Sequence, residues 1–181
     1  MILETERLIL CRYNRRYIND EFEILSDKLP SCFSDLKVHN VEDLTKLIEN
    51  KINDEFFYII VLKSNNKMIG ELFGALEEDL ETFSPCWLLN KNYEGKGYAF
   101  EAVNLYFNYL FNYRNIRRIY AYVETDNVKS QNLCKRINMR LEGVFKEFIS
   151  FKKDNFGRKI YEDTMEFAIL KSEFNTFYTG K

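Results

Sequence analysis

Residues 92–102 read N-Y-E-G-K-G-Y-A-F-E-A, and this stretch decides the fold of the chain. Residues 86–89, just before it, have the short length and apolar content of a buried strand. Apolar residues then recur at helical spacing along one face of the following segment, at Phe100, Val103, Phe107, Leu110 and Phe111. The sequence therefore predicts a strand, a tight glycine turn and an amphipathic helix.

The Gly95-Lys96-Gly97 turn is a candidate phosphate site. Helix N-termini carry unsatisfied N–H groups and a partial positive charge, and glycines let the backbone approach a phosphate closely. Lys96 adds a cation, although a plain strand-to-helix turn is the alternative. A dinucleotide fingerprint would need glycine or alanine at Phe100, and a Walker loop would need serine or threonine at Gly97. Adenine dinucleotide and nucleoside triphosphate chemistry are therefore disfavoured.

The remaining chain alternates strand and helix patterns in one mixed α/β (α+β) domain over residues 1–181. We expect further strands over residues 5–13, 56–62, 68–76, 118–124, 141–151 and 160–170. Helices are expected over residues 18–29, where Pro30 ends the helix, and over residues 41–52, where Asn40 is the cap. A further short helix is expected to start at the Asp126-Asn127 cap and to end at Ile137. This gives about seven strands and about four helices.

Composition and charge exclude several classes of protein. The chain is 46% hydrophobic and 30% charged, which is typical of a globular protein. Its 26 Lys+Arg and 28 Asp+Glu leave a net charge of −2, whereas a general nucleic-acid binder needs a basic excess. No apolar run approaches the roughly 20 residues of a membrane helix, and the acidic start is unlike a signal peptide. We expect a soluble cytoplasmic protein with no nucleic-acid or membrane partner.

The cysteines and the single histidine do not predict a metal site, a disulfide framework or a catalytic triad. The cysteines are far apart, at Cys11, Cys32, Cys86 and Cys134. This spacing predicts neither a metal site nor a disulfide framework. His39 is the only histidine, so a catalytic triad would depend on it, and a loop histidine beside the Asn40 cap is the plainer interpretation.

Three blocks resemble the GNAT superfamily of acyl-CoA-dependent N-acetyltransferases. They are E-T-E-R-L-I-L-C-R at residues 4–12, the 92–102 stretch, and N-V-K-S-Q-N-L-C-K-R-I-N-M at 127–139. They occur in the family's order along nearly the whole chain and most resemble the Rim-type (RimJ/RimL-like) branch, which acetylates ribosomal-protein N-termini. The resemblance implies a single-domain fold with a twisted, mostly antiparallel sheet. It also implies direct acetyl transfer from acetyl-CoA to a primary amine.

The resemblance further implies which residues bind CoA. The loop that wraps the pyrophosphate corresponds to Asn92, Glu94, Gly95, Lys96 and Gly97, with Tyr98 and Ala99 in the first helical turn. The preceding strand would pair with pantetheine and aim an N–H at the thioester oxygen, through Trp87, Leu88 and Leu89. On the 127–139 block, Asn127 would meet pantetheine, and the nucleotide end would be reached by Lys129, Ser130 and Lys135. A solvated helix face is the alternative for the two lysines.

Several positions depart from the family pattern. Asn92 replaces the usual glutamine or arginine, and Ser84 stands where Rim-type relatives often carry a glutamate. Cys134 replaces a tyrosine that donates a proton to the departing CoA thiolate in many members. It would either donate weakly or pack as a small apolar residue. Asn138 replaces a glycine at the helix exit, and asparagine tolerates the left-handed conformation expected there.

Two carboxylates are candidates for the general base, Glu71 in mid-strand and Glu124 at a strand end. Partial burial would raise their pKa values toward the working range, although each could be an exposed strand charge. A site with a weak general acid and a weak general base suits an α-amine, whose pKa is about 7.7–8.0, better than a lysine amine, whose pKa is about 10.4. We therefore expect a peptide N-terminus as acceptor. Acidic residues between positions 16 and 55 could also attract a polyamine or another small cationic amine, although a solvated helix face is the alternative.

Two hypotheses remain at this point. The first is an acetyl-CoA-dependent N-acetyltransferase without a metal, and the second is a catalytically weak acyl-CoA sensor or interaction protein. The replacements at Asn92, Ser84 and Cys134 motivate the second. Pairing of two copies through the last strands is left open.

Overall fold

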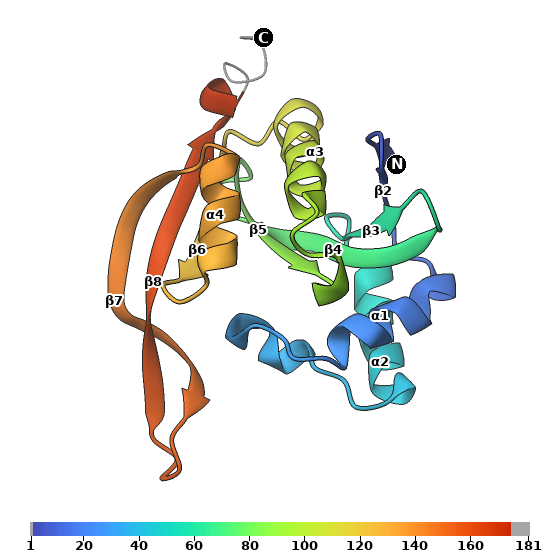
Figure 1. The fold of residues 1–181 in the computed structure, drawn as a ribbon. Helices are drawn as coiled ribbons and strands as arrows, with labels where there is room; N and C mark the ends of the chain where they lie inside the picture. The colour runs from blue at the N-terminus through green and yellow to red at the C-terminus, as the bar shows by residue number, and fades with distance from the viewer. Residues whose placement is uncertain (1, 175–181) are drawn as a thin grey trace. The chain divides into compact units, whose positions relative to one another are not determined.

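The structure, a computed structural model, describes residues 2–174 (Figure 1). The chain forms two compact units by its internal contacts. The first comprises Met1–Ala75 and Cys86–Asn108, and the second comprises Leu76–Pro85 and Tyr109–Lys181. A single functional domain over residues 1–181 stays a prediction.

The first unit begins with strands and helices in quick succession. Its elements are β1 (Leu3–Glu4), β2 (Leu8–Cys11), the 3-10 helix η1 (Arg15–Tyr17), α1 (Ile18–Leu25), the 3-10 helix η2 (Ser31–Leu36), α2 (Val41–Asn53), β3 (Tyr58–Leu62) and β4 (Lys67–Leu76). The end of β5 (Thr82–Leu89), the 3-10 helix η3 (Lys91–Tyr93) and the start of α3 (Tyr98–Tyr113) complete it.

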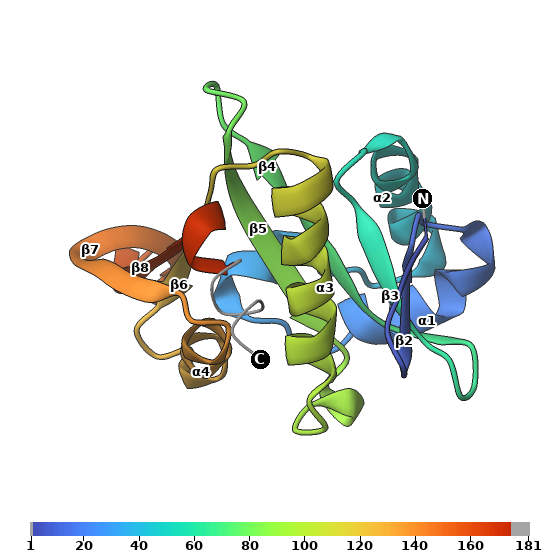
Figure 2. The ribbon, with the colours of Figure 1, turned by 90° about the horizontal axis from the view of Figure 1, so that it is seen from above.

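Helices cover both faces of the strands in this unit. Below β3 and β4 in Figure 1, α1 and α2 contribute Ile24, Leu44 and Ile48 to a core that also holds Ile59 of β3. On the other side lies α3, and Figure 2 shows it crossing over the strands. Its Tyr106 hydroxyl donates to the Phe56 carbonyl at 2.7 Å. Because both faces are covered, β3 is buried along its whole length.

The second unit contains the remaining strands together with α4 (Val128–Arg136) and the end of α3. Its elements are the start of β5, the end of α3, β6 (Arg118–Glu124), α4, β7 (Arg140–Lys153) and β8 (Lys159–Leu170). Along β6 the alternate residues Ile119, Ala121 and Val123 are buried. The long β7–β8 hairpin contains register shifts, and Glu147 adopts a φ of 47° at one of them.

The strands follow the order β1-β2-β3-β4-β5-β6-β8-β7. Antiparallel ladders join β1 to β2, β2 to β3, β3 to β4, β6 to β8 and β7 to β8, whereas β5 and β6 are parallel. The predicted mixed, mostly antiparallel sheet is confirmed, with eight strands instead of about seven. The additional strand is the two-residue β1, which pairs Leu3 with Leu10.

Three predicted element bounds are wrong by three or more residues. The strand predicted over residues 5–13 is β2 and starts at Leu8, because residues 5–7 form a turn in which the Thr5 N–H donates to the Leu8 carbonyl at 3.0 Å. Helix α1 ends at Leu25, well before Pro30, and η2 follows that proline. Strand β5 begins at Thr82, so it is twice the predicted length.

Local predictions about helix ends are confirmed. The Asn40 side chain accepts from the Asp43 N–H at 2.8 Å, and the Asn127 side chain accepts from the Ser130 N–H at 3.1 Å. Asn138 follows α4 with a φ of 64°, the left-handed conformation that asparagine tolerates. Within residues 2–174, no helix combines the length and the apolar character needed to cross a bilayer.

Candidate active site

The glycine loop in the first unit has the backbone conformation that its glycines allow. Gly95 and Gly97 adopt φ values of 73° and 82°, a region that side chains with a Cβ avoid. A Cβ on Gly95 would meet no atom within 4 Å, and one on Gly97 would approach only Arg7, at 3.5 Å. Glycine is therefore required at both positions by the positive φ angles, and not because neighbouring atoms would clash with a side chain.

Backbone donors gather on this loop. Among the described residues, the N–H groups of Gly95, Lys96 and Gly97 donate to no protein acceptor. The first turn of α3 follows directly and adds helix N–H groups that have no intrahelical partner. The Lys96 ammonium group donates to the Asn92 carbonyl at 3.2 Å, so a positive charge lies on the same loop. These groups fit a pyrophosphate.

Asn90, which the sequence reasoning missed, anchors the start of the loop. It is buried, and its side-chain oxygen accepts from the Asn92 N–H at 3.0 Å. Its amide donates to Glu23 of α1 at 2.8 Å, and its backbone N–H donates to the Ile69 carbonyl of β4 at 2.8 Å. An asparagine directly after an apolar strand is a turn signal that would have found it.

The strand before the loop lies close to β4. A Cβ on Gly70 of β4 would lie 2.5 Å from the Leu88 carbonyl oxygen, so only glycine fits there. The Leu88 side chain is buried, whereas Trp87 and Leu89 are half-buried. The close approach fixes the segment that the resemblance assigns to pantetheine.

The remaining predicted CoA contacts lie in the second unit, around α4. Asn127 is half-buried, and its side chain caps α4 by accepting a hydrogen bond from the Ser130 backbone N–H. Lys129 and Lys135 are exposed. Buried Gln131, which the sequence reasoning did not single out, donates to the Thr125 carbonyl at 3.0 Å and so ties α4 to the end of β6.

Glu71 lies inside the core of the first unit. Its side chain is fully buried, and one oxygen accepts from the Lys51 ammonium group at 2.8 Å. Lys51 of α2 also donates to buried Glu21 of α1. Burial raises the pKa of Glu71 above its ordinary value despite the nearby Lys51. The interpretation of Glu71 as an exposed charge on a strand is therefore wrong, because its carboxylate is part of a buried ionic cluster.

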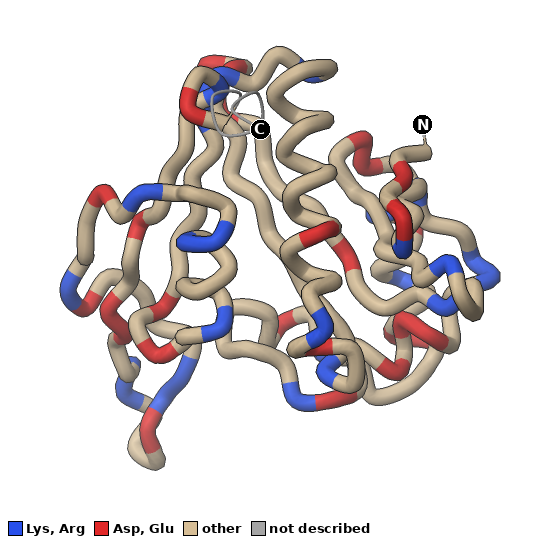
Figure 3. Tube along the Cα trace, turned by 45° about the horizontal axis from the view of Figure 1, so that its top comes forward, with Lys and Arg blue, Asp and Glu red and all other residues tan. Residues whose placement is uncertain are grey.

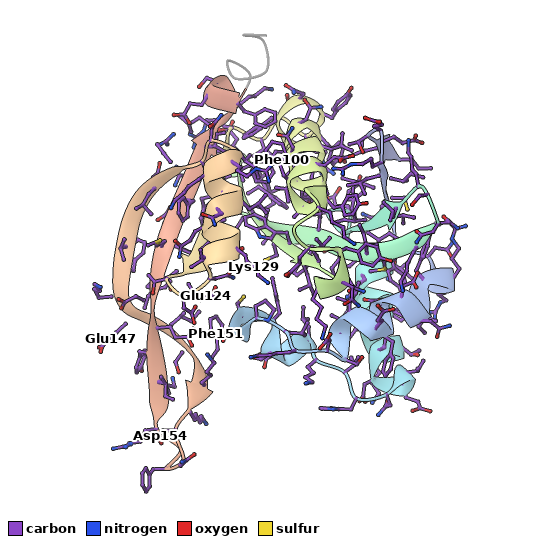
Figure 4. The ribbon with its side chains drawn as sticks, in the orientation of Figure 1. Phe100, Glu124, Lys129, Glu147, Phe151 and Asp154 are labelled. Carbon is purple, nitrogen blue, oxygen red and sulfur yellow. The ribbon has the colours of Figure 1, made fainter. Side chains whose placement is uncertain are left out.

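Glu124 has a different environment, in the second unit. It lies where β6 ends and the chain turns toward α4 (Figure 4). The residue is 8% exposed, and no hydrogen bond or ion pair of its carboxylate is found among the described residues. Its backbone carbonyl accepts from the Asn127 N–H at 2.9 Å, which fixes the strand end. The carboxylate is thus largely enclosed and available to a proton donor.

Cys134 lies on the inner face of α4 and has no exposed surface. Burial raises the pKa of its thiol to about 12. A thiol with that pKa remains neutral at physiological pH and packs as a small apolar group. None of the four described cysteines, Cys11, Cys32, Cys86 and Cys134, forms a disulfide. In the part of the chain that the structure describes, no group of three or more His, Cys, Asp or Glu side chains could hold a metal ion.

Comparison with known proteins identifies the family. The acetyltransferase (GNAT) domain matches residues 7–140, which include the glycine loop and α4. The chain belongs to the GNAT acetyltransferase family. It is 28% identical over 176 residues to Uncharacterized N-acetyltransferase YnaD of Bacillus subtilis (strain 168), covering 97% of this chain and 100% of the relative.

Solved structures agree with this assignment. A GNAT-family acetyltransferase from Bacillus anthracis superimposes with a TM-score of 0.82 at 26% identity, over 96% of this chain and 100% of the other. Mutant forms of the spermidine/spermine N-acetyltransferase SpeG from Vibrio cholerae share the fold, with a TM-score of 0.74 at 18% identity, over 96% of this chain and 99% of theirs. The protein is thus a GNAT N-acetyltransferase, a family that uses acetyl-CoA as co-substrate. The Rim-type branch stays a prediction.

Proposed function

We propose that this enzyme transfers the acetyl group of acetyl-CoA directly to a primary amine, with residues 95–97 and the start of α3 binding the pyrophosphate. The observation that carries the proposal is the row of N–H groups without protein acceptors in the glycine loop, next to a helix N-terminus. Adjacent Lys96 supports the same assignment through its charge.

We assign the general base to Glu124. In the proposed step the amine nitrogen attacks the thioester carbon and loses a proton to Glu124 through a water molecule. The carbon–sulfur bond then breaks, and CoA leaves as the thiolate. Glu71 is the weaker candidate because it is fully buried and its carboxylate already binds Lys51.

Cys134 has no part in the proposed proton transfers. Proton transfer from a thiol of pKa about 12 to a CoA thiolate of pKa about 8.5 would be uphill by about 5 kcal/mol. The thiolate is a good enough leaving group to depart without an acid. An amine of low pKa needs the least help from the base, and a peptide α-amine, at about 7.7–8.0, meets that condition better than a lysine-like amine at about 10.4. A small amine such as a polyamine would depend more strongly on Glu124.

Acetyl-CoA should raise the melting temperature of the protein. At about a hundredfold above its dissociation constant, a ligand adds roughly 2.7 kcal/mol, which is about 5–10 °C for a chain of this size. The measurement is thermal unfolding with acetyl-CoA, with ATP and NAD as controls. A panel of amines read out by thiol release then tests turnover. A shift without thiol release for any amine would indicate a sensor, and no shift would overturn the loop assignment.

Glu124→Gln should lower kcat by about 10²- to 10⁴-fold, because general base catalysis is typically worth that much. Affinity for acetyl-CoA should stay unchanged, since the carboxylate is not part of the glycine loop. The variant should recover activity as pH rises, because more of the amine is then already deprotonated. Glu147→Gln, at an exposed site on β7, is the matched control. Wild-type kcat in Glu124→Gln would exclude Glu124 as the base.

A further inference from the structure

The N-terminal E-T-E-R block has no role in the site described above, yet it binds the helix that starts at the glycine loop. The contact is made through Glu101, the single charged residue of α3. The rest of this helix is tan in Figure 3, the colour of uncharged residues. Glu101 accepts from the Thr5 hydroxyl and from the Arg7 backbone N–H, the latter at 3.3 Å. The Arg7 Nε donates to its other oxygen at 2.7 Å.

Arg7 also touches the loop itself. Its Nη1 donates to the Lys96 carbonyl at 3.1 Å, and its guanidinium lies 4.6 Å from the centre of the Tyr98 ring. One side chain therefore contacts the central loop residue, the first helical residue and the carboxylate one turn further along. The Glu101 N–H donates to the Gly97 carbonyl at 3.1 Å, which closes the first turn on the same residues.

The bond to Lys96 fixes the direction of a phosphate donor. In a trans peptide, the carbonyl of one residue and the N–H of the next point in opposite directions. The Lys96–Gly97 bond is trans, and Arg7 holds the Lys96 carbonyl. The Gly97 N–H is consequently directed away from Arg7, and it has no acceptor within the described residues. Losing Arg7 would free this peptide to rotate.

The bond to Glu101 removes an electrostatic conflict. A carboxylate in the first turn of a helix occupies the positive end of the helix dipole and would repel a phosphate bound there. Burial alone would raise the pKa of Glu101, but the hydrogen bonds from Thr5 and Arg7 hold the pKa below its ordinary value. Glu101 is therefore charged at neutral pH, and the Arg7 guanidinium compensates that charge.

We propose that Arg7 is a positioning residue for acetyl-CoA: it orients the Lys96–Gly97 peptide toward the pyrophosphate and neutralises Glu101 at the helix end. The proposal rests on the proposed function of the loop. It assigns the N-terminal block to the cofactor site, although no atom of Arg7 needs to touch the phosphate.

Arg7→Met should raise the KM for acetyl-CoA about 10- to 100-fold, with kcat at saturating acetyl-CoA unchanged. The deciding readout is S-acetylpantetheine, an acetyl donor without the pyrophosphate, for which kcat/KM should be the same in Arg7→Met and wild type. Arg7→Lys should recover part of the affinity, because it keeps the charge and loses the fork geometry. Adding Glu101→Gln to Arg7→Met should also recover part, because it removes the uncompensated charge.

Arg15→Met is the matched control, since Arg15 forms an exposed pair with Glu49 elsewhere in the first unit. It should leave both KM values at wild type. Equal losses of kcat/KM with both donors in Arg7→Met, or an unchanged KM for acetyl-CoA, would overturn the proposal. A wild-type protein that turns over S-acetylpantetheine and acetyl-CoA with the same KM would instead overturn the loop assignment on which the proposal rests.

Discussion

Gly97→Glu should abolish measurable acetyl-CoA binding, with a loss of affinity greater than about 100-fold. Two effects act together. The φ of 82° is unfavourable for any residue with a Cβ, so the loop would leave the conformation that presents its N–H groups. The new carboxylate would also repel the pyrophosphate. Isothermal titration with acetyl-CoA, together with far-UV circular dichroism to establish folding, measures the effect.

Gly157→Glu is the matched control for this prediction. Gly157 adopts a φ of 80° in the β7–β8 turn, and a Cβ there would meet no atom within 4 Å. It therefore has the same backbone conformation, receives the same charge and lies in a different turn. Binding should be retained in Gly157→Glu. Wild-type affinity in a folded Gly97→Glu protein would mean that the loop does not contact the phosphates.

Lys51→Met should lower the free energy of unfolding by about 3–5 kcal/mol at pH 7, because it leaves two buried carboxylates without a cation. Glu21 and Glu71 have no exposed surface, and one oxygen of each has no hydrogen-bond partner in the described structure. Lys51 supplies the charge compensation for both. For a chain of this size the melting temperature should fall by about 10 °C.

Lys46→Met provides the control on the same helix, because Lys46 is largely exposed and its pair with Asp43 is long, at 3.9 Å. It should change stability by less than about 0.5 kcal/mol. Unfolding in urea at pH 7 measures both variants. A Lys51→Met protein as stable as Lys46→Met would show that the buried carboxylates do not need the ammonium group.

The pH dependence of stability follows from the direction of the Glu71 shift. Burial raises the pKa of Glu71, so between its unfolded and folded pKa values the native state binds more protons than the unfolded state. The contribution of this group to stability is fully present below the unfolded pKa and is lost as pH rises through the folded pKa. The deficit of Lys51→Met should accordingly shrink on acidification, since protonation removes the uncompensated charge.

Local chemistry could be predicted from sequence because it depends on a few consecutive residues. The Asn40 and Asn127 caps, the left-handed Asn138 and the strand–turn–helix at residues 86–111 all follow from backbone preferences and short hydrogen bonds. The family resemblance rests on the same local blocks, and the GNAT domain match over residues 7–140 confirms it.

The tertiary structure decided which long-range partners each charged residue meets. Glu71 was interpretable from sequence as a base or as an exposed charge, but its partner Lys51 lies on α2, 20 residues away. Thr5 and Arg7 are 96 and 94 residues from Glu101, and no local pattern predicts that pairing. Sequence alone determined the family and the strand–glycine turn–helix segment, since these depend on backbone conformation within one segment. The ionisation and accessibility of each carboxylate depend on what packs against it, and packing is set by the fold as a whole.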